Sequence, residues 1–126
     1  MLDENTKDYI EDRASRCAIE GIVESLINIL GAKMTAYLSG ANCTDILNLW
    51  LLGVEKPTKL EELRLRYAYR AAAVINVEYG SEMAVTIFRG MNGMLDDRAP
   101  AFWLRHHGKE EDFKLVVSAA LNVMDL

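Results

Sequence analysis

Apolar residues recur at every third or fourth position along most of the chain, which is the spacing of one face of an α-helix. Few stretches alternate with period two, and β-branched residues are nowhere dense enough to favour strands. The pattern therefore predicts an all-α fold of about six to eight helices. We expect two regions, residues 1–57 and residues 58–126, that pack together as one unit.

The first region begins with a run of helical spacing over residues 9–30. The preceding aspartates and Asn5–Thr6 can cap this run. Gly21 lies inside it and is either tolerated, at a cost of about 1 kcal/mol, or divides the run into two helices. Gly31 is expected to form the C-cap.

Two short helices are then expected, at residues 32–39 and 45–52, joined by the turn Gly40–Ala41–Asn42. Asn42 or Thr44 can cap the second one. Their lengths fit a helix-turn-helix-like segment at residues 32–53, whose second helix would contact DNA bases. That helix is poor in base-contacting side chains, so the segment is either a working motif or a structural remnant. The candidate DNA-binding residues are Lys33, Thr44, Asn48, Lys56 and Lys59.

The second region begins with the clearest helix, because Thr58 and Glu61 have the spacing of a capping box. Its expected buried stripe is Leu60, Leu63, Tyr67, Ala71, Val74 and Val77. Gly80 should end it, and Ser81 should cap a helix whose buried face is Met83, Ile87, Phe88 and Met91. A loop over residues 90–99, a short helix from Pro100 and a last helix over residues 110–124 complete the prediction. The last helix should bury Phe113, Val116, Val117, Ala120 and Met124.

Composition and charge reduce the number of protein classes to which the chain can belong. The chain has 126 residues, a net charge of −5 and two cysteines, which is an ordinary soluble composition without a disulfide framework or a zinc site. Residues 1–30 carry seven acids against three bases, a net of −4, and residues 31–60 carry two against three, a net of +1. Any DNA-facing patch should therefore lie in the middle of the chain. The acidic start and the short apolar runs indicate a cytoplasmic protein without a signal peptide or membrane span.

Chemistry-bearing residues do not form a catalytic pattern. His106 and His107 are adjacent on a helix and point about 100° apart, so they are expected to cap a helix end rather than to share a metal ion. Two interpretations are open for Asp96, Asp97 and Arg98. We expect them to stabilise the positive end of the following helix rather than to act as a catalytic pair of carboxylates with an arginine. No nucleophile or phosphate-binding loop is recognisable. We therefore expect neither an enzyme nor a cofactor.

The stretch RLRYAYRAAAVINVEYGSEMAVTIFRGMNGMLDDRAPAFWLR resembles antitoxins of the Xre/MbcA/ParS group. The matching elements are the Arg/Tyr/Ala-rich helix 64–77, the Phe88–Arg89–Gly90 helix end, and Asn92, Leu95 and Pro100. The upstream segment LGAKMTAYLSGANCTDILNLWLLGVEKP, with Trp50 and Gly53, is similar to the helix-turn-helix half of these proteins. The resemblance covers roughly residues 30–124. Where the family often has Ser or Thr before the proline, this chain has Ala99, and Asp97 is expected to cap the helix instead.

The resemblance implies a non-enzymatic antitoxin of a type II toxin–antitoxin system, which binds a RES-domain toxin and protects NAD from it. The consecutive Phe102, Trp103 and Leu104 cannot all face one core, so one of them is either an exposed interface anchor or a bridge between helices. The expected toxin-binding residues are Arg89, Asn92, Asp96, Asp97, Arg98, Trp103 and Arg105. A DNA-binding regulator, which could repress its own operon, and a helical interaction domain remain the alternatives, and self-association is left open.

Overall fold

The computed structural model of the chain describes residues 2–125, so only the outermost positions of the two expected regions, 1 and 126, lie outside it. These residues form eight α-helices and one 3-10 helix, and no strand occurs among them. The all-α prediction is confirmed. The helices are α1 Glu4–Arg16, α2 Ile19–Leu30, α3 Ala32–Ser39, α4 Asp45–Leu51, α5 Lys59–Tyr79, α6 Ser81–Arg89, α7 Pro100–His106 and α8 Glu110–Val123, with the 3-10 helix η1 at Gly93–Leu95 between α6 and α7.

Helix boundaries follow capping chemistry. Asp3 begins α1 by accepting a hydrogen bond from the backbone N–H of Thr6 at 2.7 Å, and this bond holds the pKa of its carboxyl below the ordinary value. The predicted Thr58–Glu61 capping box is present at the start of α5. Gly40 ends α3 in the left-handed conformation, with φ 98°. Local sequence signals therefore define these three helix ends.

Two expected side-chain caps are absent, and the first helical run does not divide at Gly21. Thr44 precedes α4 without a capping hydrogen bond, and Gly80, not Ser81, occupies the N-cap position of α6. The first run of helical spacing is divided at Cys17–Ala18, whereas Gly21 lies within α2. A Cβ atom at Gly21 would lie 2.7 Å from the Cys17 sulfur, so glycine is needed there for close packing.

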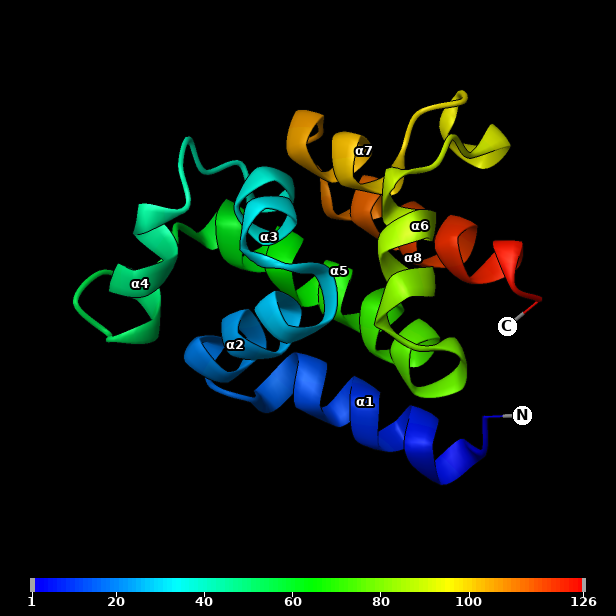
Figure 1. Cartoon of the computed structure of the whole chain (residues 1–126), viewed down its shortest axis with the longest axis horizontal. Coiled ribbons are helices and arrows are strands. Elements are labelled where there is room, and N and C mark those ends of the chain that lie inside the picture. The colour runs from blue at the N-terminus through cyan, green and yellow to red at the C-terminus, as the bar shows by residue number, and fades with distance from the viewer. Residues whose placement is uncertain (1, 126) are drawn as a thin grey trace.

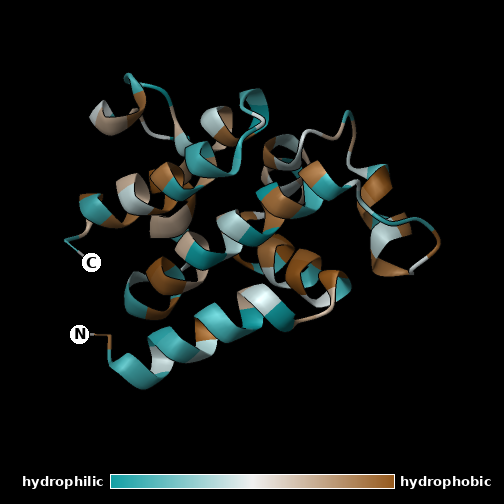
Figure 2. Ribbon diagram, turned by 180° about the vertical axis from the view of Figure 1, so that it is seen from behind, coloured by the Kyte–Doolittle hydropathy of each residue, from teal (hydrophilic) through white to brown (hydrophobic). Residues whose placement is uncertain are grey.

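The long helix α5 passes through the middle of the molecule and contacts α1, α2, α3, α6 and α8 (Figure 1). Figure 2 shows the contrast between α1, whose residues are mostly hydrophilic, and the largely apolar α2 beside it. The inward face of α5 combines large apolar side chains with a run of buried alanines, whose small size allows neighbouring helices to approach closely. Its fully buried members include Leu65, Ala68, Ala71, Ala72 and Ile75. Helices of both expected regions thus pack on one shared helix.

Three residues expected in the core are exposed. Val77 is 57% exposed, because it lies two positions, or about 200°, beyond the buried Ile75 on the helix. Met83 lies at the edge of α6, whose inward face is Ala84, Ile87 and Phe88. Met91 follows Gly90, where the chain becomes extended and leaves the buried face of α6, and it is 82% exposed.

Arginine side chains close several helix C-termini from neighbouring elements. Arg66 donates to the carbonyl of Ala14 at 2.9 Å, near the end of α1. Arg64, on the same helix, donates to Ser39 at the end of α3 and to His107 just after α7, at 3.2 and 2.8 Å. Because the last carbonyls of a helix have no intrahelical donor, a cation there satisfies them and complements the helix dipole.

Among residues 2–125, no helix combines the length and the apolar character needed to cross a membrane.

Candidate functional site

The loop between α6 and α7 contains most of the expected toxin-binding residues and is held from within. The amide nitrogen of Asn92 donates to the Ala119 carbonyl in α8 at 3.0 Å, and its side-chain oxygen accepts from the Met94 backbone at 2.9 Å. Asn92 is 8% exposed and Leu95 is fully buried. Asn92 therefore anchors the loop to the core, and its polar groups are occupied.

Two consecutive aspartates form the turn of this loop. Asp96 and Asp97 have φ angles of 53° and 63°, in the left-handed region that aspartate tolerates better than most residues. Their side chains are exposed, and the turn brings Asn92 and Arg98 into an isolated antiparallel bridge. Asp97 does not cap α7, because the N-cap position is Ala99, which provides no side-chain hydrogen bond. The prediction of an Asp97 cap was therefore wrong.

The outward side of the loop presents apolar side chains beside charged ones. Met91 is 82% exposed and Met94 is 44% exposed. Arg98 is also exposed, and its guanidinium lies 5.0 Å from the centre of the Phe102 ring. Exposed methionines on a fixed backbone are typical of protein-docking surfaces, because the flexible thioether adapts to its partner.

The three consecutive large residues of α7 have three different environments. Leu104 is fully buried in the core. Trp103 bridges α7 and α8, since its indole N–H donates to the Asp112 carbonyl at 3.1 Å, and its ring stacks on His107 at 3.9 Å. Phe102 is half-buried and lies at a groove on the surface. Of the two alternatives for the triplet, the structure thus favours the helix bridge for Trp103 and leaves Phe102 as the accessible aromatic.

Arg105 has a structural role, because its side chain connects α7 to the end of α3. Its guanidinium donates to the carbonyls of Tyr37 and Ala41 at 2.8 and 3.0 Å, and it lies 4.8 Å from the centre of the Tyr37 ring. These contacts join α7 to the C-terminus of α3. Arg89, in contrast, is exposed at the end of α6. Of the seven expected toxin-binding residues, Arg89, Asp96, Asp97 and Arg98 are exposed, whereas Asn92, Trp103 and Arg105 have structural contacts.

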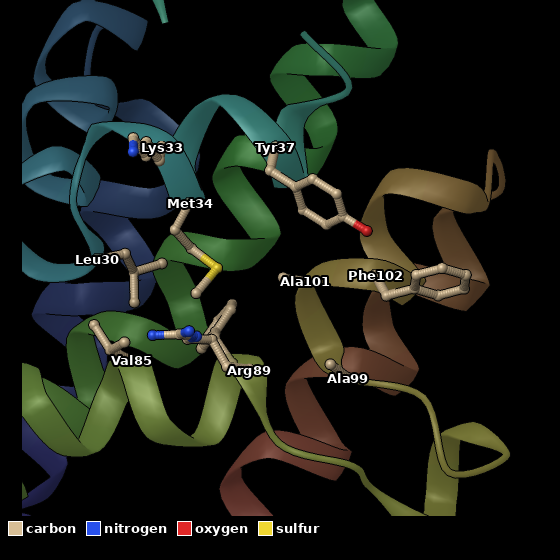
Figure 3. Close-up of a pocket in the computed structure, with 10 residues that line it drawn as sticks. Leu30, Lys33, Met34, Tyr37, Val85, Arg89, Ala99, Ala101 and Phe102 are labelled. Carbon is tan, nitrogen blue, oxygen red and sulfur yellow. The ribbon is translucent and has the colours of Figure 1, made fainter. Parts of the chain in front are cut away.

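A groove of about 580 Å³ lies between α3, α6 and α7 (Figure 3). Leu30, at the end of α2, and Met34, on α3, face Val85, on α6, across its apolar part. Lys33 and Arg89 are its cationic residues. The remaining lining residues are Tyr37, Phe88, Ala99, Ala101 and Phe102. Sequence patterns could not identify this groove, because it combines residues from four separate elements.

The candidate DNA-binding residues are all exposed: Lys33, Thr44, Asn48, Lys56 and Lys59. Lys33 and Thr44 line one shallow hollow between α3 and the turn before α4. On α4 itself, Leu47 and Trp50 are buried, and the exposed positions are Asp45 and Asn48. The helix that would read bases therefore presents one carboxylate, one amide and no cation.

The remaining candidate side chains are those of the two histidines and the two cysteines. His107 faces the Trp103 carbonyl through its Nδ1 atom at 2.9 Å, and the His106 ring lies tilted against the Phe102 ring, with the ring centres 4.1 Å apart. Cys17 and Cys43 are free thiols. Within residues 2–125, no group of three or more His, Cys, Asp or Glu side chains is arranged to hold a metal ion.

The most perturbed ionisable group lies on α5. Burial, together with the hydrogen bond from its hydroxyl to Glu110 at 2.6 Å, raises the pKa of Tyr67 to about 12. Burial also lowers the pKa of Arg64 and raises that of Tyr69. These groups lie at helix contacts and do not line the groove. Burial is the largest cause of each of these three pKa shifts.

Comparison with known proteins adds no relative: no family model, no curated protein and no solved structure matches this chain.

Proposed function

We propose that the chain is an antitoxin that binds a RES-domain toxin and thereby protects cellular NAD. The sequence support is the resemblance to Xre/MbcA/ParS antitoxins over roughly residues 30–124. The residues that carry this resemblance have definite roles in one loop: Asn92 anchors it, Leu95 fills the core beneath it, and Pro100 starts α7. The motif therefore corresponds to a built structural unit.

The observation that carries the proposal is the exposure of Met91, Met94 and Arg98 on this anchored loop. A loop whose backbone is already fixed loses little conformational entropy when a partner binds. Exposed methionine together with arginine is a composition enriched at protein interfaces. The loop thus has the properties of a docking element, and it adjoins the groove that Arg89 and Phe102 line.

Inhibition of this kind requires no catalytic group from the antitoxin. A protein that covers the toxin's NAD-binding site excludes the substrate by occupying space, and its effect depends only on affinity. The proposal therefore makes this chain a non-enzymatic binding partner without a cofactor. It also assigns the chain to the cytoplasm, where it would meet the toxin and the NAD pool.

Co-expression tests this function. The chain is produced together with the protein encoded beside it, and growth, cellular NAD and complex formation are measured. We expect the neighbouring protein alone to lower NAD and arrest growth, and the pair to restore both and to co-purify. The proposal fails if no neighbouring gene product forms a complex with the chain.

A DNA-binding regulator is the second candidate. The exposure of Lys33, Lys56 and Lys59 around the helix-turn-helix-like segment favours it, because phosphate contacts need accessible cations. Asp45 on the exposed side of α4 weakens it, since a carboxylate repels the DNA backbone. A gel shift on the chain's own promoter distinguishes a sequence-selective repressor from an antitoxin that binds DNA only weakly.

A further inference from the structure

The groove between α3, α6 and α7 is shallow. Leu30, Phe88 and Ala101 form its floor, and their exposed fractions are 5%, 0% and 4%. Met34 and Val85 are half-buried and rise on either side. A small ligand needs to bury most of its own surface to bind well, which a shallow floor does not allow. A segment of another protein can instead lay one apolar face over the groove and leave its other face in water.

The charge of the groove is opposite to that of the chain as a whole. The net charge is −5, yet the lining includes Lys33 and Arg89 and no acidic residue. Among residues 2–125, neither cation takes part in a hydrogen bond or an ion pair. Other arginines have partners: Arg16, Arg66 and Arg70 pair with carboxylates. The two groove cations are thus available to carboxylates from outside the chain.

The groove is also asymmetric along its length. In Figure 3 the guanidinium of Arg89 is directed toward the end where Leu30 and Val85 lie, and Lys33 lies on that same side. Tyr37 and Phe102 lie at the other end. An occupant that satisfies both ends carries carboxylates at one end and an apolar or aromatic residue at the other.

We infer that this groove receives an acidic amphipathic segment of the toxin, with its carboxylates at Lys33 and Arg89 and its apolar side chains over Met34 and Val85. The inference rests on the proposed function and identifies the chemistry of the partner at that surface. It extends the docking surface from the loop after α6 to α3, which belongs to the helix-turn-helix-like half. Toxin binding would therefore cover Lys33, a candidate DNA-binding residue.

Photocrosslinking on the full chain identifies the occupant. A benzoylphenylalanine is placed at Met34 in one variant and at Val77 in a control variant, each is bound to the neighbouring toxin, and the crosslinked toxin peptide is identified by mass spectrometry. Val77 is exposed on α5 and lines no part of this groove. We expect a crosslink from position 34 to a segment with at least two carboxylates flanking apolar residues, and none from position 77.

Charge reversal tests the electrostatic part of the inference. Lys33→Glu and Arg89→Glu should each weaken toxin binding at least about tenfold, because each places a carboxylate against those of the partner. The matched controls are Lys56→Glu and Arg16→Glu, which change the net charge equally at exposed positions outside the groove. The controls should bind within about twofold of the unmodified chain. Circular dichroism and melting temperature verify that all four variants fold.

The outcomes separate this inference from the proposed function. If a tight complex forms but Lys33→Glu, Arg89→Glu and the controls all bind equally, the groove is not the docking site, and the antitoxin function stands. A crosslink from position 34 to a basic or uncharged segment also overturns the inference. If no complex forms at all, the proposed function fails and this inference fails with it.

Discussion

Arg64 is a side chain whose loss should weaken the contact between α3 and α7, two of the helices that line the groove. It extends from α5 and donates to Ser39 at 3.2 Å and to His107 at 2.8 Å, the carbonyl groups at the ends of α3 and α7. Both helices line the groove. Arg64→Ala removes both hydrogen bonds and takes this donor away from the carbonyls of Ser39 and His107.

The magnitude follows from these contacts. Each hydrogen bond to a charged group contributes about 1.5–3 kcal/mol, and we take the lower end because the burial that lowers the pKa of Arg64 also destabilises its charge. The expected loss in the free energy of unfolding is therefore about 3 kcal/mol. A domain of this size is stable by about 5–15 kcal/mol, so the variant should still fold.

Urea denaturation measures this loss, with an unchanged m-value as the sign that the native and denatured states keep their compactness. Arg16→Ala is the control, because the Arg16 side chain is 81% exposed, and it should cost less than about 0.5 kcal/mol. Arg64→Lys should recover only part of the loss, since one ammonium group does not reproduce the two-armed guanidinium. A loss for Arg64→Ala no larger than that of the control would refute this account of the helix ends.

A double-mutant cycle with Gly40 isolates the contact further. A Cβ atom at Gly40 would lie 2.6 Å from the Arg64 Nη1 atom, and the φ of 98° is unfavourable for any L side chain. Gly40→Ala should thus cost about 1–2 kcal/mol from the backbone, plus the displacement of Arg64. In the Arg64→Ala background only the backbone cost remains, so the two losses should sum to more than the loss of the double variant. Strict additivity would contradict the proximity of these groups.

Further predictions concern the loop, one titrating group, α7 and DNA. Because Asp97 has a left-handed φ of 63°, Asp97→Gly should be neutral or stabilising by less than about 1 kcal/mol, and Asp97→Val should cost about 2 kcal/mol of stability. Thermal denaturation measures both changes, and equal losses would argue against that conformation. Because the pKa of Tyr67 rises to about 12 from an ordinary value of 10, the unfolded chain loses that proton first, so stability should fall between about pH 10 and 12. Tyr67→Phe should reduce this fall in a urea titration at each pH, and an unchanged profile would exclude Tyr67 as a contributor. Trp103→Phe should cost about 1 kcal/mol of stability and leave toxin affinity unchanged, whereas reduced affinity at unchanged stability would make Trp103 an interface anchor. Duplex DNA should bind weakly and with strong salt dependence, and nanomolar, sequence-selective binding in a gel shift at physiological salt would show that α4 is a better base-reading helix than its side chains indicate.

The helices were predictable where local chemistry defines them. Gly31 and Gly40 end two helices by adopting positive φ, and Thr58 starts another through its capping box. The residues involved lie within a few positions of one another, so their pattern is visible in the sequence. The all-α fold and the limits of α3 follow directly from such signals.

The side chains at helix ends and in the groove were not predictable, because their partners are distant in the sequence. Arg64 and His107 are 43 positions apart, and Arg105 and Tyr37 are 68 positions apart. Periodicity also gave Val77 the wrong environment, since it defines an apolar face but not how far a neighbouring helix covers it. The groove arises only when α3 and α6 both pack against α7, which no local pattern encodes.

Titration of the purified chain into an assay of NAD consumption by its proposed partner, a RES-domain toxin, tests the central claim most directly. The account predicts complete inhibition at a fixed stoichiometry of chain to toxin, together with a stable complex of the same composition. Full NAD consumption in the presence of a large excess of folded chain would contradict it.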